Sequence, residues 1–375
     1  MAFALSDEQN ELAATVRHLL ARRSDSGAVR RAVAQAPGYD EGLWKTLCEQ
    51  VGAAGLAIPE RYGGAGFTLV ETHVVLEQMG AALTPSPLLG SGVLAAQALL
   101  LSGHEEACTR LLPGIAEGTR VAAVCWAGED GRWSTDRGDV RAAHQGEDSW
   151  SLSGTATLVL DGPAADTLLV VAMTGPRRVG LFEVDPAGER VRVTPTPAMD
   201  PTIGLAAVQF DGAPGVPLAV DAVGLLGTLH DIAAAAVTAL QVGAAQRGLD
   251  MTVAYSKERV QFGRPIGSFQ ALKHRMADML VEVETARSAS WAAAWSAARL
   301  DSGLPERAAL AKAWCSEALN KVASETVQMH GGIAITWEHD AQLVFKRAHA
   351  TSQLFGQPHE HRRRLFRHVI GAAPR

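Results

Sequence analysis

The sequence predicts an α+β protein of several domains, in which a helical N-terminal domain and a C-terminal four-helix bundle flank a small β-sandwich or barrel. Two patterns lead to this prediction. Apolar residues recur at helical spacing in both outer parts of the chain. The middle part instead holds short β-branched runs separated by Gly, Pro and Asp. In addition, a chain of 375 residues is too long for a single hydrophobic core.

The N-terminal domain is predicted over residues 1–118. Ser6 stands before two acidic residues, the usual arrangement at the start of a helix. Apolar residues then recur at helical spacing from Leu12 to Leu20. The segment 59–66 is predicted to be a loop, because two adjacent glycines after a proline cannot continue a helix.

The β domain is predicted over residues 119–215. Its short runs are close together and have turn residues between them, which is typical of a small sandwich or barrel. The predicted strands are 121–126, 151–154, 157–160, 167–171, 179–184, 191–194 and 207–210.

The C-terminal domain is predicted over residues 216–375. Long helical patterns with short connections indicate an antiparallel bundle. The four patterns cover 218–257, 266–301, 305–330 and 338–355. Gly331 and Gly332 end the third pattern, and the polar tail 359–364 is expected to lie on the surface.

Composition excludes several classes of protein. A net charge of -6 gives no reason to expect nucleic-acid binding. The four cysteines show no CxxC spacing, which argues against a zinc site or a disulfide framework and favours a reducing, cytoplasmic location. The N-terminus lacks the features of a signal peptide. The most apolar run, 232–240, is too short for a membrane span, so we expect a soluble protein. The histidines are scattered along the sequence, so we expect no metal site.

The connection 259–270 carries the strongest chemical signal in the chain. An ordinary helix–helix turn needs Gly or Pro and little else. Here Arg259, Phe262 and Gln270 accompany the turn residues. A cation, an aromatic ring and an amide at fixed offsets suggest that a flat, anionic group is held there. No Gly-x-Gly-x-x-Gly follows a predicted strand, so a Rossmann nucleotide site is excluded.

This connection and the later run 328–332 resemble the FAD-binding signature of the acyl-CoA dehydrogenase family. Residues 5–9 and 58–66 are also similar to family patterns, so the resemblance covers essentially the whole chain. It implies FAD as cofactor, an acyl-CoA substrate, an electron-accepting flavoprotein and a hetero- or homotetramer of homologous subunits. The FAD contacts that it implies are Arg259, Gln261, Phe262, Gln270, Gln328, Gly331 and Gly332.

The residue types at these positions suit that cofactor. The planar guanidinium of Arg259 offers parallel donors to a pyrophosphate, in the family commonly one held by a neighbouring subunit. Phe262 can lie against an aromatic ring system. Gly331 and Gly332 let the backbone approach a phosphate closely, because they have no Cβ.

The catalytic positions depart from the family. In the family a carboxylate removes the substrate's α-proton while the β-hydride passes to the flavin. The two positions that supply this carboxylate in different members are Phe355 and Ala233 here. The β domain departs as well, with Ala156 where a lysine is usual and Thr167 where an aromatic residue often faces the flavin.

Three hypotheses stay open. In the first, the chain is the FAD-site-completing subunit of a heterotetramer, like the one in bacterial α2β2 members that act on steroid side-chain CoA thioesters. Its homologous partner would supply the base. In the second, the chain is a self-sufficient homotetrameric dehydrogenase whose base is displaced, to Asp231 or to Glu338. In the third, the chain is a flavin-free scaffold of the same fold that serves as an interaction protein.

Overall fold

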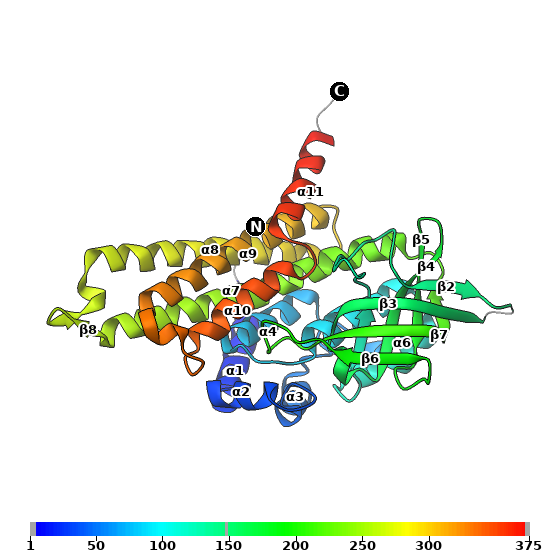
Figure 1. Cartoon of the computed structure of the whole chain (residues 1–375), viewed down its shortest axis with the longest axis horizontal. Coiled ribbons are helices and arrows are strands. Elements are labelled where there is room, and N and C mark those ends of the chain that lie inside the picture. Colours follow the sequence, from blue (N-terminus) through cyan, green and yellow to red (C-terminus); the bar gives the residue numbers. More distant parts are fainter. Residues whose placement is uncertain (1–4, 147–148, 372–375) are drawn as a thin grey trace. The chain divides into compact units, whose positions relative to one another are not determined.

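The computed structural model describes residues 5–146 and 149–371 (Figure 1). These residues form two compact units, each built from several stretches of chain. The helical unit comprises Met1–Arg30, His73–Thr84 and Ala234–Arg375, and the mixed unit comprises Arg31–Thr72 and Pro85–Ala233. The domain limits of 1–118, 119–215 and 216–375 remain a prediction from the sequence.

The helical unit contains the C-terminal bundle. Its helices are α1 (Asp7–Arg23), most of α4 (Leu69–Ala82) and of α7 (Val223–Glu258), α8 (Gln270–Arg299), α9 (Leu304–His330), α10 (Ala341–Gln353) and α11 (Pro358–Gly371). Helix α9 packs along α8, α10 and α11. Buried apolar side chains of α7, α8, α9 and α10, with Val29 and Leu83, make one continuous core. The predicted helical C-terminal part is therefore confirmed.

Local sequence signals set several helix ends. The Ser6 side chain accepts from the Gln9 amide while the Gln9 side chain accepts from the Ser6 amide, which makes a capping box at the start of α1. Helix α9 ends at His330, directly before Gly331. The polar stretch 359–364 belongs to α11, and its residues are exposed or half-buried as predicted, with the exception of His361, which is only 1% exposed.

Helices α4 and α7 cross at two glycines. A Cβ on Gly243 would lie 2.0 Å from the carbonyl oxygen of Glu77, and one on Gly80 would lie 2.4 Å from that of Leu240. Side chains at these two positions would separate the helices, so the glycines allow backbone-to-backbone packing.

The mixed unit combines a small sheet with short helices. These are the end of α2 (Ser26–Val33), α3 (Glu41–Thr46), α5 (Ala96–Ser102), α6 (Glu105–Ala116) and the short turns η1 (Leu47–Val51), η2 (Glu60–Tyr62), η3 (Leu88–Ala95) and η4 (Gly162–Ala164). The first eleven residues of α7 also belong to this unit.

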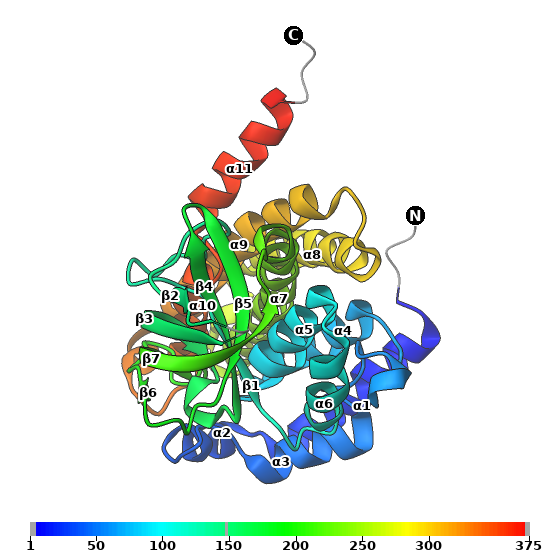
Figure 2. The ribbon, with the colours of Figure 1, turned by 90° about the vertical axis from the view of Figure 1, so that its right-hand side faces the viewer.

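The sheet closes on itself (Figure 2). Its strands are β1 (Ala122–Cys125), β2 (Arg141–His144), β3 (Trp150–Leu160), β4 (Thr167–Gly175), β5 (Arg178–Val184), β6 (Val191–Pro195) and β7 (Leu205–Ala219). Strand β4 pairs with both β5 and β2, which completes a ring through β7 and β3, while β1 and β6 extend it. Buried side chains such as Phe182, Leu152 and Val170 fill the interior. The predicted central small β domain is confirmed.

One helix in the described residues is long and apolar enough to cross a membrane by composition. It is α7, and 67% of its apolar stretch is buried inside the structure. Such burial is typical of a core helix. The apolar composition of α7 is therefore only weak evidence for a membrane span.

Candidate functional site

The predicted cofactor residues cluster at one end of the helical unit. Helix α7 runs directly into a hairpin of β8 (Val260–Gln261) and β9 (Arg264–Pro265), which leads through η5 (Ile266–Ser268) into α8 (Figure 1). The Ile266 amide donates to the Arg259 carbonyl at 2.8 Å, which closes the base of the hairpin. The turn between the strands places Phe262 at a φ of 54°, followed by Gly263 at 78°.

An aromatic stack joins the end of α7 to the end of α9. The Tyr255 and His330 rings are stacked with centroids 4.5 Å apart, and His339 lies 4.7 Å from His330 on a tilted plane. His330 Nδ1 lies 2.7 Å from the Thr326 carbonyl, so this nitrogen carries the proton. Burial lowers the pKa of both His330 and His339, which keeps the stack neutral near pH 7.

This stack brings the two sequence motifs together. Arg259 follows Tyr255 by one helical turn, and Gly331 and Gly332 follow His330 directly, at the start of η6 (Gly331–Ile335). Gly331 adopts φ 64° and ψ −143°, a conformation that is essentially restricted to glycine. An added Cβ at either glycine would meet nothing within 4 Å, so the space over this backbone is open to a ligand.

Every predicted FAD contact lies on the surface of the helical unit. Phe262 is 91% exposed, and its ring meets that of Phe269 edge-on, with the ring centroids 6.1 Å apart. Gln270 bonds its side chain to His274 at 2.8 Å. The exposed set of Arg259, Gln261, Phe262, Gln270, Gln328, Gly331 and Gly332 offers a cation, amides, an aromatic face and open backbone. This donor set fits a dinucleotide with a pyrophosphate.

The two positions of the family's base are buried and apolar. Phe355 and Ala233 are both 0% exposed. Phe355 has a φ of 56°, and its carbonyl lies 2.9 Å from His361 Nε2. Neither side chain can accept a proton.

A buried lysine holds the turn that contains Phe355. Lys312 Nζ donates to the carbonyls of Ser352 and Gly356 at 3.1 and 2.9 Å and to Ser316 Oγ at 3.1 Å. Burial lowers the pKa of Lys312 to about 7. The sequence reasoning missed this residue, although a lysine inside the alanine-rich run from Ala308 to Ala313 was a signal.

Because Lys312 is buried, we expect the free energy of unfolding to depend on pH. Its folded-state pKa is depressed, so between about pH 7 and 10.5 the unfolded chain binds more protons, and stability rises with pH in this window. From pH 7 to 9.5 we expect the free energy of unfolding to rise by up to ~3 kcal/mol relative to a Lys312→Met variant. Urea unfolding across this range measures the difference. Lys321→Met, on the exposed side of α9, is the control, and parallel curves for wild type and Lys312→Met would contradict the prediction.

The proposed displaced bases differ in their surroundings. Asp231 is 3% exposed, so it is not a surface carboxylate, and its Oδ1 lies 3.8 Å from His230 Nδ1. The Trp126 ring meets the His230 ring edge-on at 6.1 Å. Glu338 is exposed, and its carbonyl accepts from Arg30 Nη2 at 3.3 Å. Thr167, which replaces the family's aromatic residue, accepts from Arg120 Nη1 at 3.0 Å.

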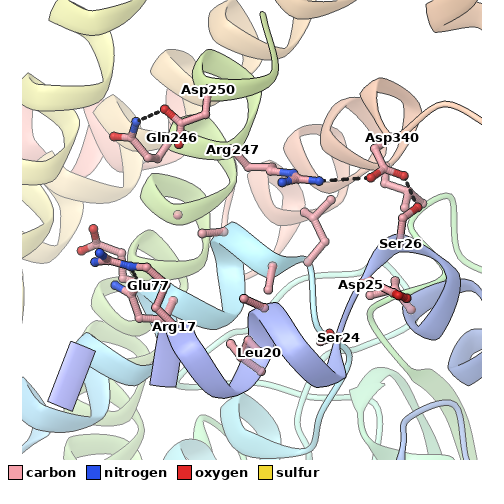
Figure 3. Close-up of a pocket in the computed structure, with 18 of the residues that line it drawn as sticks. Arg17, Leu20, Ser24, Asp25, Ser26, Glu77, Gln246, Arg247, Asp250 and Asp340 are labelled. Atoms are coloured by element: carbon pink, nitrogen blue, oxygen red, sulfur yellow. Dashed lines mark hydrogen bonds and ion pairs between the residues drawn. The ribbon is translucent and has the colours of Figure 1, made fainter. Parts of the chain in front are cut away.

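The helical unit also contains a cavity of about 680 Å³ (Figure 3). Residues of α1, α2, α4, α7, α8 and the start of α10 line it. All four of its acidic side chains are held by neighbouring groups: Arg287 pairs with Glu77, Arg247 pairs with Asp340, Gln246 donates to Asp250, and the Ala28 amide donates to Asp25.

Comparisons with known proteins agree with this fold. The model of the acyl-CoA dehydrogenase N-terminal domain matches residues 6–119, and that of the acyl-CoA dehydrogenase C-terminal domain matches residues 228–370. The chain therefore belongs to the acyl-CoA dehydrogenase family.

Its relatives include proteins named as acyl-CoA dehydrogenases. It is 43% identical to the acyl-CoA dehydrogenase IpdE2 of Mycolicibacterium smegmatis, over 98% of this chain and 100% of the relative. Among solved structures, it is similar to a chain of the ChsE4-ChsE5 complex from Mycobacterium tuberculosis, with 32% identity, a TM-score of 0.89 and full coverage of both chains. A chain of the Tcur3481-Tcur3483 steroid ACAD matches with 32% identity and a TM-score of 0.89, covering 98% of this chain and 99% of that one.

Proposed function

We propose that the chain is the FAD-site-completing subunit of an acyl-CoA dehydrogenase and that a homologous partner subunit supplies the catalytic carboxylate. The observation that carries this proposal is the contrast between the positions of the catalytic base and the predicted FAD contacts. Both base positions, Phe355 and Ala233, are buried and apolar, whereas every predicted FAD contact is present and exposed.

In this proposal FAD, when bound, accepts the hydride that leaves the acyl-CoA. The residues of this chain bind and orient it. Arg259 neutralises the pyrophosphate, Phe262 covers a ring face, and the amides of Gln270 and Gln328 bond ribose or ring heteroatoms. No side chain at position 355 or 233 moves a proton.

Exposed apolar groups near the motifs support assembly with another subunit. Phe262, Ile335 and Trp337 are 91%, 75% and 71% exposed. Large apolar side chains that are this exposed are typical of protein interfaces. The family resemblance implies that Arg259 reaches FAD across a subunit boundary. We therefore propose a heterotetramer with FAD at this boundary.

The names of the relatives suggest a class of substrate. One similar structure is named a steroid ACAD, and another is a complex of two differently named chains. We propose that the complex acts in the cytoplasm on an acyl-CoA with a steroid-derived acyl group and passes electrons to a flavoprotein acceptor.

A self-sufficient enzyme is the second candidate function. Asp231 favours it, because a buried carboxylate beside an imidazole is a reasonable proton acceptor. In this reading the chain alone binds FAD, and Asp231→Asn abolishes turnover without loss of flavin.

Co-expression separates these functions. The chain is purified alone and together with a homologous dehydrogenase subunit that carries the catalytic glutamate. We expect a colourless chain alone and a yellow complex whose visible flavin absorbance bleaches with acyl-CoA. A chain that is yellow and bleached by itself would overturn the partner role and support the Asp231 enzyme. The absence of flavin from both preparations would contradict both enzyme hypotheses and favour the flavin-free scaffold.

A further inference from the structure

Asp340 makes an unusual set of contacts for a residue in its place. It is the N-cap residue of α10, where a carboxylate ordinarily accepts from the amides of its own helix. Its side chain makes no such capping bond. Instead His339 Nδ1 accepts from the Ala341 amide at 3.2 Å. The Asp340 carboxylate is thus free for contacts with other parts of the chain.

Those contacts come from two other helices. Arg30 Nη2 donates to Asp340 Oδ1 at 3.2 Å, and Arg247 Nη2 donates to Oδ2 at 3.2 Å. Ser26 donates its hydroxyl to Oδ1 as well. Figure 3 shows Arg247 and Ser26 reaching the carboxylate from different sides. We call Ser26, Arg30, Arg247 and Asp340 the Asp340 cluster.

The Asp340 cluster is less exposed than an ordinary surface ion pair. The Asp340 side chain is 16% exposed, and those of Arg30 and Arg247 are 33% and 43% exposed. Isolated exposed pairs contribute almost nothing to stability, but a carboxylate shared by two guanidinium groups is a network with restricted geometry. Arg30 also donates to the Glu338 carbonyl, so it holds the backbone beside Asp340 too.

The cluster fixes one end of the segment 330–340. The other end is fixed by His330, which stacks on Tyr255 and bonds Thr326. Contact between the His330 and His339 rings closes the segment into a loop with both ends held. Between them lie the exposed Gly331 and Gly332.

We infer that Asp340 is a positioning residue for FAD: through Arg30 and Arg247 it holds the 330–340 segment so that Gly331 and Gly332 meet the cofactor. This inference rests on the proposed function, because it requires that the complex bind FAD at these glycines.

The test uses Asp340→Asn in the full chain within the FAD-loaded complex. Asp250→Asn is the matched control, because Asp250 lines the same cavity and is bonded by Gln246. Two quantities are measured: the FAD dissociation constant by flavin fluorescence, and amide hydrogen exchange across the segment. We expect Asp340→Asn to weaken FAD binding roughly tenfold and to speed exchange at 331–340. Asp250→Asn should change neither quantity.

Further variants separate positioning from general stability. Arg247→Gln should reproduce the loss, and the double variant Asp340→Asn with Arg247→Gln should lose less than the sum of the two. Asp340→Glu, which keeps the charge, should recover part of the affinity. Lower melting temperature with unchanged FAD affinity would overturn the inference, as would faster exchange with unchanged affinity. A wild-type complex that binds no FAD would instead refute the proposed function, and the inference with it.

Discussion

Replacing Gly243 with alanine is expected to lower the free energy of unfolding by about 3 kcal/mol or more. The new Cβ would lie 2.0 Å from the Glu77 carbonyl oxygen and 2.6 Å from the Ala81 amide nitrogen. Both neighbours are backbone atoms, so relief requires helices α4 and α7 to move apart. The gain in helix propensity, about 1 kcal/mol, does not offset this cost.

The same helix provides the control for this variant. Gly227 also lies in α7, and a Cβ there would meet nothing within 4 Å. Gly227→Ala should therefore raise stability by about 0.5–1 kcal/mol. Urea unfolding of the three proteins measures the differences. If Gly243→Ala and Gly227→Ala have equal stabilities, the close crossing of α4 and α7 is refuted.

Arg259→Ala is expected to weaken FAD binding by the complex roughly a hundredfold, or about 3 kcal/mol. The exposed guanidinium at the base of the hairpin is the cation that we assign to the pyrophosphate. Arg259→Lys keeps the charge and loses the planar pair of donors, so we expect a loss of about tenfold. Flavin fluorescence titration gives both values.

Lys257→Ala is the charge-matched control for Arg259. It removes one positive charge two residues earlier, from an exposed position near the end of α7. We expect no more than about a twofold change in the FAD dissociation constant, because long-range interactions between exposed charges are screened. Equal losses in Lys257→Ala and Arg259→Ala would mean that net charge, and not a direct contact, attracts the cofactor.

The sequence predicted the helices better than the strands. Long helical patterns predicted α7 to α10 within a few residues, because a helix is specified by contacts close in sequence. The runs 151–154 and 157–160 were predicted as two strands, and the structure joins them in β3 through an irregular pairing with β7. Strand β2, Arg141–His144, was missed because it contains no β-branched residue. Its place depends on pairing with distant strands.

The candidate site likewise was predicted where its residues are close in sequence and missed where they are far apart. The residues of the Arg259 connection and of the glycine pair were found because they form compact motifs in the sequence. The Asp340 cluster was not found, because Ser26, Arg30 and Arg247 are far from Asp340 along the chain. The His330–His339 contact joins residues nine apart across an irregular turn. No periodic pattern signals either arrangement.

The outward-facing Phe262, Ile335 and Trp337 have a consequence for the cell as well as for the enzyme. If the proposed partner subunit covers these side chains, a copy synthesised in excess of it keeps them in water, where they favour self-association and attract chaperones and proteases. The proposed assembly therefore demands matched synthesis of the two subunits. Surplus copies of this chain should be degraded faster than those already paired.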